Sequence, residues 1–394
     1  MTTVAVALAA AAAVLVLWSY AGYPAVVSRL ARRASPPSPR PSPQRGEGEV
    51  HEEAPQNFEA PSVEILVAAF DEENVIRRRV EDALGQVYPG ALQVSVGCDG
   101  CRDRTAEAAR EGGDGRVRVE EFPVRRGKAA VLNDLVSSAR ADILVFTDAN
   151  STFAEGAIAR LVDRFADPSV GAVCGRLVLE PETGPGQTPE TEFWDRETRL
   201  KEAEGKLGVC LGGNGAIYAA RRRLVRPLPE ETALDDFLVP ARIAREGWSV
   251  AFERDAVARE STAPDVLAEA SRRLRIGIGA GGVLRRERWL FDSRTRPLLA
   301  LAFVSRKAAR WIAPVVGLLA VVAGLASPVL RPAAAVAALV VVLAVASIPL
   351  RPRPAGWPGK LYYFFVMNLA LAAGVVAGLA GHRRPAWDRT ARPA

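Results

Sequence analysis

The sequence predicts an α/β domain with a mostly parallel sheet, placed between membrane helices at both ends of the chain. In the middle of the chain, short apolar runs rich in β-branched residues alternate with helical segments of about a dozen residues, which is typical of βαβ units. Long uncharged apolar stretches occupy both ends. The 394 residues are 49% hydrophobic and 24% charged, which excludes a disordered or collagen-like chain.

Residues 1–28 are expected to form an N-terminal transmembrane anchor. The stretch 4–27 carries no charge and is long enough to cross about 30 Å of hydrocarbon. No basic segment precedes it, which argues against a cleaved signal peptide. The arginines that follow it, Arg29, Arg32 and Arg33, place the next part of the chain in the cytosol by the positive-inside rule.

Residues 29–61 are rich in Pro, Ser and Glu and predict a flexible linker. Residues 62–295 follow as the cytosolic α/β domain. Within it, strands are expected at 62–69, 93–98, 117–121 and 142–147, and helices between them at 73–84, 104–111 and 128–139. In such a sheet, ligands bind beyond the carboxyl ends of the strands, so side chains at those ends are the candidates for a site.

The C-terminal part of the chain predicts a return to the membrane. Residues 296–310 are expected to form an interfacial helix, residues 311–381 three transmembrane helices, and residues 382–394 a basic tail. Three spans would place the tail opposite the cytosol, whereas its arginines favour the cytosolic side, so the sequence leaves that side open. The chain is thus expected to be a multi-pass protein of the cell (inner) membrane.

Acidic residues stand at three of the predicted strand ends. Asp71 and Glu72 follow the first strand, Asp99 follows the second, and Asp148 closes the fourth. A lone carboxylate at such a place is often a helix cap, but three together would gather oxygens suited to ribose hydroxyls and a divalent cation. Lys128 stands at the start of a helix, where it could oppose the charge of a diphosphate.

Composition excludes several other chemistries. The two histidines, His51 and His382, lie outside the domain, so a general base there must be of another type, and a carboxylate is the best candidate. No phosphate-binding GxxxxGK[ST] loop and no GxGxxG occur. The CDGC sequence at 98–101 could be a redox pair. In a redox motif the first cysteine normally opens a helix, whereas here the turn-forming residues Asp99 and Gly100 stand between the two cysteines. The net charge of +6 arises largely beside apolar segments, which favours membrane phosphate over nucleic acid as the partner.

Six motifs stand in order between residues 60 and 290: VEILVAAFDEENVI, VGCDGCRDRT, RRGKAAVLND, VFTDAN, GGNGAIYAARR and ALDDF. In order and spacing they resemble the membrane-bound family-2 glycosyltransferases with the GT-A fold, the group that contains cellulose, hyaluronan and poly-N-acetylglucosamine synthases. The resemblance implies an inverting transfer of a sugar from a nucleotide-diphosphate donor, expected to be a UDP-sugar. It also implies a glycan or lipid-linked acceptor and a divalent cation, Mg²⁺ or Mn²⁺.

The resemblance also implies roles for individual residues. Asp236 of the Asp235–Asp236 pair would be the general base, and Asp148 and Asn150 would hold the metal. Contacts with the nucleotide sugar are expected from Ala69, Asp71, Glu72, Asp99, Lys128, Asn133, Asp148 and Arg275. Contacts with the acceptor are expected from Trp194, Glu197, Gly213 and Asn214, on a helix and on the glycine-rich loop that follows it.

Two departures from the family pattern leave alternatives open. Asn150 stands where the family has a second carboxylate, so metal affinity should be weaker, and a catalytically inactive nucleotide-binding membrane scaffold remains an alternative. The QxxRW sequence of processive synthases is degenerate, at 272–276, with a competing match that ends at Arg288 and Trp289. A single transfer to a lipid-linked acceptor is therefore an alternative to polymer synthesis, and a homo-oligomer or a membrane partner subunit stays open.

Overall fold

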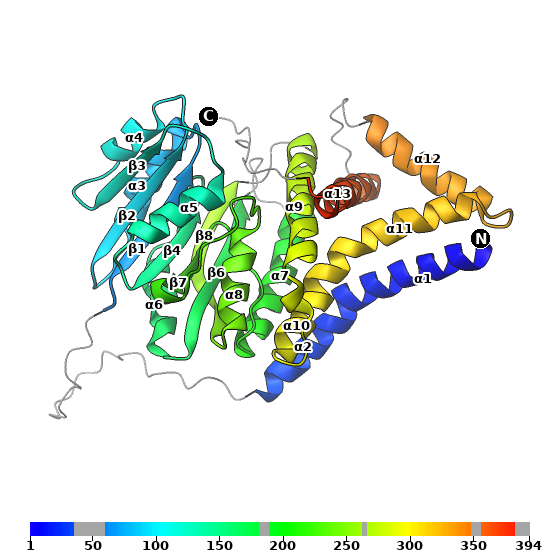
Figure 1. The fold of residues 1–394 in the computed structure, drawn as a ribbon, viewed down its shortest axis with the longest axis horizontal. Coiled ribbons are helices and arrows are strands. Elements are labelled where there is room, and N and C mark those ends of the chain that lie inside the picture. Colours follow the sequence, from blue (N-terminus) through cyan, green and yellow to red (C-terminus); the bar gives the residue numbers. More distant parts are fainter. Residues whose placement is uncertain (35–59, 181–188, 262–265, 348–355, 383–394) are drawn as a thin grey trace.

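The computed structural model describes residues 1–34, 60–180, 189–261, 266–347 and 356–382. Most of the expected linker and nearly all of the basic tail therefore lie outside the described residues. The described chain forms a sheet domain from which a group of long helices projects to one side, with α1 and α11 side by side (Figure 1).

The sheet has eight strands in the order β3-β2-β1-β4-β7-β6-β8-β5. The strands are β1 Val63–Ala69, β2 Leu92–Asp99, β3 Val117–Phe122, β4 Ile143–Asp148, β5 Thr152–Phe153, β6 Val170–Glu180, β7 Tyr218–Arg221 and β8 Ser249–Ser261. β7 runs antiparallel to β4 and β6, and β5 runs antiparallel to β8, whereas all other neighbours are parallel. The predicted mostly parallel sheet is confirmed.

Helices cover both faces of the sheet. They are α3 Glu73–Leu84, α4 Thr105–Glu111, α5 Lys128–Ser138, α6 Ala157–Asp163, α7 Pro189–Lys206, α8 Asp235–Arg245 and α9 Val266–Arg286. α3, α4 and α6 share one apolar core with the sheet, and α5, α7 and α8 share the other. Every residue of β1 is buried, as expected for a parallel strand covered on both sides, and this explains why its sequence is apolar except for Glu64, which pairs with Arg118.

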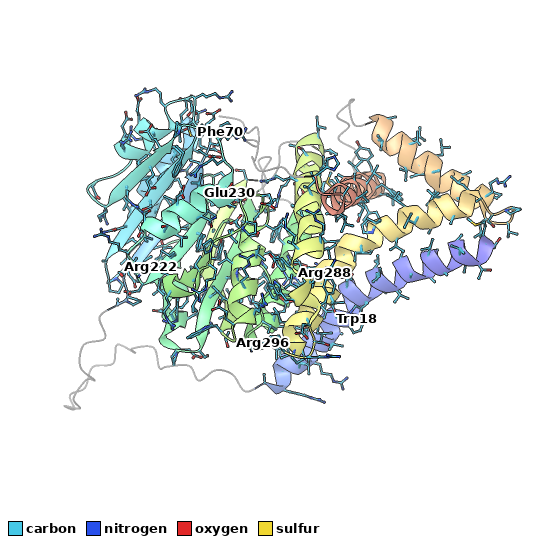
Figure 2. The ribbon with its side chains drawn as sticks, in the orientation of Figure 1. Trp18, Phe70, Arg222, Glu230, Arg288 and Arg296 are labelled. Carbon is cyan, nitrogen blue, oxygen red and sulfur yellow. The ribbon has the colours of Figure 1, made fainter. Side chains whose placement is uncertain are left out.

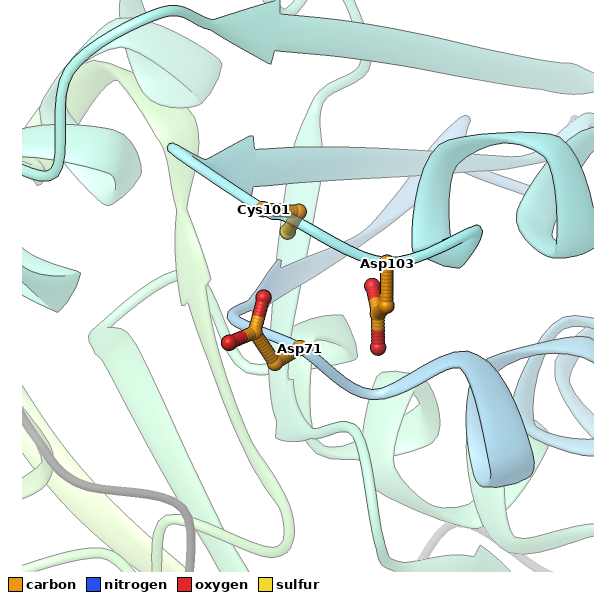
Figure 3. A group of neighbouring side chains, drawn as sticks. All are labelled: Asp71, Cys101 and Asp103. Atoms are coloured by element: carbon orange, nitrogen blue, oxygen red, sulfur yellow. The ribbon is translucent and has the colours of Figure 1, made fainter.

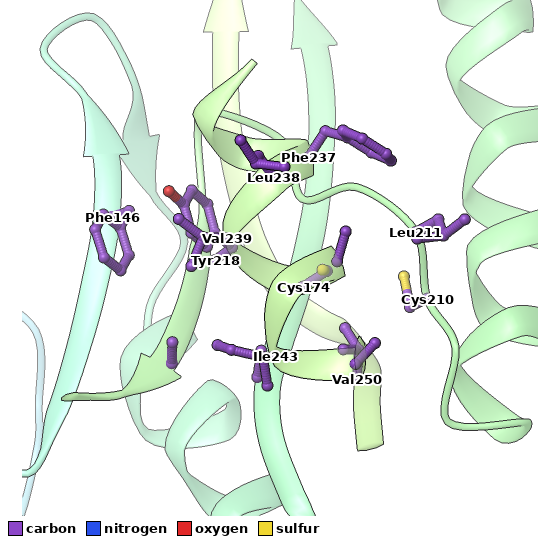
Figure 4. Close-up of a cluster of buried hydrophobic side chains, with 14 of the residues drawn as sticks. Phe146, Cys174, Cys210, Leu211, Tyr218, Phe237, Leu238, Val239, Ile243 and Val250 are labelled. Carbon is purple, nitrogen blue, oxygen red and sulfur yellow. The ribbon is translucent and has the colours of Figure 1, made fainter. Parts of the chain in front are cut away.

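The second core supports the helix that carries the acidic pair. Phe146 of β4 and Tyr218 of β7 stack with their ring centroids 4.6 Å apart, and Phe237 and Ile243 of α8 belong to the same buried cluster (Figure 4). Large side chains buried against both elements fix α8 relative to the end of β4. The first turn of α8 is thereby held close to the carboxyl edge of the sheet.

Three helices are long and apolar enough to cross a membrane: Thr2–Arg33, Pro297–Leu325 and Leu361–Leu379. The first joins α1 Thr2–Leu17 to α2 Tyr23–Arg33, the second joins α10 Pro297–Ala302 to α11 Ala309–Leu325, and the third lies in α13 Gly356–Leu379. Two of the three expected C-terminal spans are thus found among the described residues. The middle helix, α12 Arg331–Ser347, is described only up to Ser347 and is a shorter apolar helix there, so the third span stays a prediction. The residues expected to form a separate interfacial helix, 296–310, instead begin the continuous helix Pro297–Leu325.

Two of these long helices contain a π-helical turn where they meet the sheet domain. The turns are Trp18–Gly22 and Phe303–Ala308. The indole Nε1 of Trp18 donates a hydrogen bond to Ser305 Oγ at 2.9 Å, and Figure 2 labels Trp18 at this junction. Since π-helical turns are frequent at functional sites, the two turns mark this junction as a candidate functional region.

The helix α9 is joined closely to α13 by glycines. A Cβ atom at Gly277 would lie 2.4 Å from the carbonyl oxygen of Leu371, and one at Gly378 would lie 2.2 Å from that of Ile278. Only hydrogen fits at these positions, so the two backbones are in direct contact. We refer to this contact as the glycine seam. It connects a helix of the sheet domain to a candidate membrane span.

Candidate functional site

Three elements bring charged side chains together at the carboxyl edge of the sheet. Nζ of Lys128, at the start of α5, lies 2.8 Å from Oδ1 of Asp148, at the end of β4, and 3.3 Å from Oδ2 of Asp235, at the start of α8. The hydroxyl of Tyr218 donates a hydrogen bond to Asp235 Oδ2 at 3.2 Å. Three residues far apart in the sequence, each predicted for the site, thus form one charged group.

The charges in this group shift one another's pKa values. Burial disfavours the charged form of Lys128, but Asp148 and Asp235 outweigh burial and raise the pKa of Lys128 above its usual value. Burial, and then the charge of Asp235, raise the pKa of Asp236. Lys128 therefore stays protonated, while Asp236 has the raised pKa that suits a group which takes up a proton.

Asp99 holds the loop that leads to Lys128. Its side chain is fully buried, and its two carboxylate oxygens accept the backbone N–H groups of Arg126 at 2.7 Å and Gly127 at 2.8 Å. Asp99 thus fixes the start of α5, and with it the position of the Lys128 side chain. A direct contact of Asp99 with a nucleotide stays a prediction.

The carboxylates after β1 mainly join two loops (Figure 3). Asp71 has a left-handed backbone, with φ of 51°, and its carboxylate binds the backbone N–H and the guanidinium of Arg102, both at 2.8 Å. Burial opposes ionisation, but the hydrogen bonds from Arg102 outweigh it and lower the pKa of Asp71. Ligating atoms of Asp71, Cys101 and Asp103 lie within 4.8 Å of one another. Oδ2 of Asp103 also accepts the backbone N–H of Glu73 at 3.3 Å, which ties the loops further.

Three other residues expected to contact the donor form hydrogen bonds that hold neighbouring loops together. The carbonyl oxygen of Ala69 accepts a hydrogen bond from Cys101 Sγ at 3.6 Å, and the backbone N–H of Glu72 donates to Thr105 Oγ1 at 2.8 Å, so both belong to the loops after β1 and β2. The amide of Asn133 binds both polar backbone atoms of Leu228, each at 2.8 Å, which ties α5 to the loop before α8.

Arg275 of α9 interacts electrostatically with the charged group. Burial, followed by Arg272, lowers its pKa, while the charges of Asp148, Asp235 and Asp236 raise it. The competing match further along lies elsewhere: Trp289 packs under the guanidinium of Arg245, 4.9 Å from its ring centroid. Contact of Arg275, from the degenerate sequence at 272–276, with the nucleotide sugar stays a prediction.

The glycine-rich loop before β7 is held from below by Lys201 of α7. The ammonium of Lys201 donates to the carbonyl oxygen of Gly213, at 3.3 Å, and to Oδ1 of Asn214. The side-chain NH₂ of Asn214 donates to the carbonyl oxygen of Gly175 at 3.1 Å. The ring centroid of Trp194 lies 5.6 Å from the Lys201 ammonium. Asn214 and Lys201 therefore shape the loop, and the expected contacts of Trp194, Gly213 and Asn214 with an acceptor stay predictions.

Glu197 lies at the junction with the membrane helices. Its carboxylate binds the guanidinium of Arg306 at 2.7 Å and also that of Arg310. Burial would raise the pKa of Glu197, but these two cations outweigh it and lower the pKa below the usual range. Arg306 also pairs with Glu204, which accepts a hydrogen bond from Tyr23 Oη at 2.8 Å. We call Tyr23, Glu197, Glu204, Arg306 and Arg310 the junction cluster.

The residues at the end of β4 fit a divalent cation. The Asp148 side chain is 36% exposed, and a Cβ at Gly215 would come within 2.4 Å of its Oδ2, so glycine leaves one carboxylate oxygen accessible. Asn150, two residues on, offers an amide oxygen. Mg²⁺ is commonly held by one or two side-chain oxygens together with substrate phosphates, which this pair could provide.

Sequence reasoning missed the cations that the helix Pro297–Leu325 brings to the domain. The sequence suggested an interfacial helix here, since Arg306, Lys307 and Arg310 looked like residues facing lipid phosphate. The signal for these pairings was present in the sequence, because charges within an apolar helix of spanning length are costly and usually face a partner inside the protein.

The cysteines of the CDGC sequence, Cys98 and Cys101, are free thiols. Gly100 between them has a φ of 66°, so this segment forms a turn and not a helix.

Comparisons with known proteins agree with this geometry. A family model, "Glycosyltransferase like family 2", matches residues 60–279. An N-acetylglucosaminyltransferase of Rhizobium leguminosarum bv. trifolii is 32% identical over 140 residues, which cover 34% of this chain and 77% of that protein. The chain belongs to glycosyltransferase family 2.

The chain is also similar to a glycolipid synthase in sequence and to a solved mannosyltransferase in fold. A beta-monoglucosyldiacylglycerol synthase of Synechocystis sp. is 29% identical over 209 residues, 48% of this chain and 42% of that protein, so the chain spans less than half of this relative's length. The structure of a mannosyltransferase from Pyrobaculum calidifontis in complex with GDP-mannose and Mn²⁺ covers 94% of this chain and 99% of its own, with a TM-score of 0.63 and 24% identity. The GT-A fold expected from the sequence is confirmed.

Proposed function

We propose that this chain is an inverting glycosyltransferase that moves a sugar from a nucleotide-diphosphate donor, UDP-linked, to a glycan or lipid-linked acceptor at the cytosolic face of the cell membrane. The observation that carries the proposal is the charged group of Lys128, Asp148 and Asp235, with Asp236 beside it, at the carboxyl edge of the sheet. That edge is where ligands of such sheets bind.

Each residue of this group has a chemical task in the proposed reaction. The carboxylate of Asp236 takes the proton of an acceptor hydroxyl, whose oxygen forms a bond to the anomeric carbon as the bond from that carbon to the diphosphate breaks. A single displacement of this kind inverts the anomeric centre. Lys128, held protonated by its acidic neighbours, offsets the negative charge that develops on the leaving diphosphate.

Asp148 and Asn150 would hold the divalent cation. When bound, such a cation neutralises charge on the diphosphate oxygens. Support comes from the accessible carboxylate of Asp148 and from the Mn²⁺ in the Pyrobaculum structure, whose donor is GDP-mannose. Mn²⁺ and Mg²⁺ are both candidates.

We favour a single transfer to a lipid-linked acceptor over polymer synthesis. The three candidate spans among the described residues are few for a channel that carries a polymer, and the QxxRW sequence is degenerate. An even number of spans after the domain, such as the two found in the described part of the chain, would return the tail to the side of the domain, which agrees with the arginines of the tail and with a cytosolic domain.

Nucleotide release from a panel of donors tests the proposal. Membranes containing the full chain would be incubated with UDP-glucose, UDP-N-acetylglucosamine, UDP-galactose and GDP-mannose, with extracted lipid as acceptor and Mn²⁺ present. We expect UDP release with one UDP-sugar. Release from GDP-mannose alone would overturn the assignment of a UDP-linked donor. Nucleotide binding without release from any donor would favour the inactive scaffold.

Asp148→Ala should abolish donor binding and turnover together. The substitution removes the proposed metal ligand and also the carboxylate 2.8 Å from Lys128 Nζ. Binding of UDP with and without Mn²⁺ would be measured by calorimetry, with Asp255→Ala, a change at an exposed aspartate, as the matched control. Parental affinity for UDP and Mn²⁺ in the Asp148 variant would remove the metal assignment.

Asn150→Asp should tighten metal binding about tenfold. A second carboxylate supplies the charge that the amide lacks, and hard divalent cations favour charged oxygen ligands. The measurement is the Mn²⁺ concentration that gives half-maximal activity or half-maximal UDP binding. If that concentration stays the same or rises, Asn150 is not a ligand.

A further inference from the structure

The helix Pro297–Leu325 brings three cations to the sheet domain: Arg306, Lys307 and Arg310. Charges in a helix of this apolar character are costly, so each needs a compensating partner or a function. Arg306 and Arg310 have partners in the junction cluster. For Lys307, the structure gives neither a hydrogen bond nor an ion pair with any described residue, so its charge has no such partner in the described chain.

The side chain of Lys307 extends to the backbone that surrounds Asp236. A Cβ at Gly212 would lie 3.1 Å from Lys307 Nζ, and Gly212 has a φ of 90° that favours glycine at this position. The next residue, Gly213, donates its backbone N–H to the carbonyl oxygen of Asp236 at 2.6 Å. Nζ of Lys307 also lies 5.6 Å from the ring centroid of Phe237, the residue after Asp236. The ammonium therefore stands beside the start of α8.

Charged and titratable groups of seven elements interact electrostatically with Asp236: Asp235 on α8, Lys128 on α5, Lys201 on α7, Arg275 on α9, Tyr218 on β7, Cys174 on β6, and Lys307 on the helix Pro297–Leu325. Lys128 is already bound to Asp148 and Asp235, and Lys201 to the glycine-rich loop. The electrostatic interaction of Arg275 with Asp148 and with Asp235 is stronger than its interaction with Asp236. Among these cations, Lys307 lowers the pKa of Asp236 the most.

We propose that Lys307 is a positioning residue of the site, supplied by the candidate membrane helix, and that its ammonium keeps the Asp236 carboxylate ionised and ready to accept a proton. The inference rests on the proposed function, in which Asp236 is the base. It makes attachment of the helix Pro297–Leu325 to the domain a condition of catalysis, because without this helix burial and Asp235 would favour the protonated acid.

The sign of the effect follows from the charges. A positive charge beside a carboxylate lowers its pKa, so removal of Lys307 should raise the pKa of Asp236 by about one unit or more. A base works only when it is ionised, and activity is lost as the pH falls through its pKa. The acidic limb of the pH profile should therefore move to higher pH, with activity recovered under alkaline conditions.

The test compares full-length Lys307→Met, Lys307→Arg and Arg294→Met in membranes. Arg294 is an exposed cation just before the same helix, so its variant controls for the loss of one charge. For Lys307→Met we expect the acidic limb of kcat/KM to shift upward by about one pH unit or more, with unchanged UDP affinity. Lys307→Arg should restore most of the parental profile, and Arg294→Met should match the parent.

A second measurement does not depend on turnover. Infrared difference spectra of the parent against Asp236→Asn, recorded as a function of pH, follow ionisation of the Asp236 carboxyl directly, and Lys307→Met should move that titration upward. An unmoved titration, or an equal loss of activity at every pH in a folded Lys307→Met protein, would overturn the role of Lys307. If the parent releases no nucleotide from any donor yet the titration moves, the proposed function fails and the coupling of Lys307 to Asp236 stands.

Discussion

Asp236→Asn should lower turnover by about 10²-fold or more while the protein remains folded. Asparagine keeps the shape of the side chain and serves helix N-termini as well as aspartate does, but it cannot take up a proton at neutral pH. The carbonyl oxygen of Asp236, which accepts the N–H of Gly213 at 2.6 Å, is untouched by the change. Turnover, UDP affinity and thermal unfolding would be measured on the same membranes.

The pattern of the three readouts distinguishes a base from a structural residue. A base predicts lost turnover with nearly constant UDP affinity and stability. A structural Asp236 predicts little change with asparagine and a joint loss of stability and activity with alanine. Near-parental turnover of a folded Asp236→Asn protein would move the role to Asp235 or support the inactive scaffold.

Arg306→Met should destabilise the protein by about 3–5 kcal/mol, because it leaves Glu197 and Glu204 buried without their common partner. For a domain of this size, such a loss corresponds to a fall in Tm of about 6 °C or more. Unfolding would be followed in detergent by tryptophan fluorescence. Arg294→Met again serves as the control, and an equal Tm for the two variants would show that the junction cluster contributes little to stability.

The alternating half of the domain could be predicted closely from the sequence. The strands expected at 62–69 and 142–147 are found at Val63–Ala69 and Ile143–Asp148, because buried parallel strands need unbroken runs of β-branched and apolar residues that differ plainly from the helices between them. The gathering of Asp148 and Lys128 follows from the same rule, since carboxyl ends of parallel strands share one edge.

What the sequence could not predict depends on contacts between distant parts of the chain. Glu197 is expected at the acceptor, and that contact stays a prediction. The structure pairs its carboxylate with Arg306, more than 100 residues away, and no local pattern encodes such a pair. The antiparallel β7, only four residues long, is likewise set by its two neighbours rather than by its own sequence. The approach of Lys307 to Gly212 and to the ring of Phe237 likewise joins distant parts of the chain.

The glycine seam gives the bilayer a mechanical connection to the reacting centre. Where Gly277 and Gly378 bring two backbones into contact, no side chain lies between them to absorb a displacement, so a tilt of α13 must carry α9 with it. Since Arg275 of α9 interacts electrostatically with Asp148 and Asp235, a membrane thick or thin enough to tilt the candidate span in α13 would displace that cation. Lipid chain length would then act on the enzyme as an effector that never enters its active site.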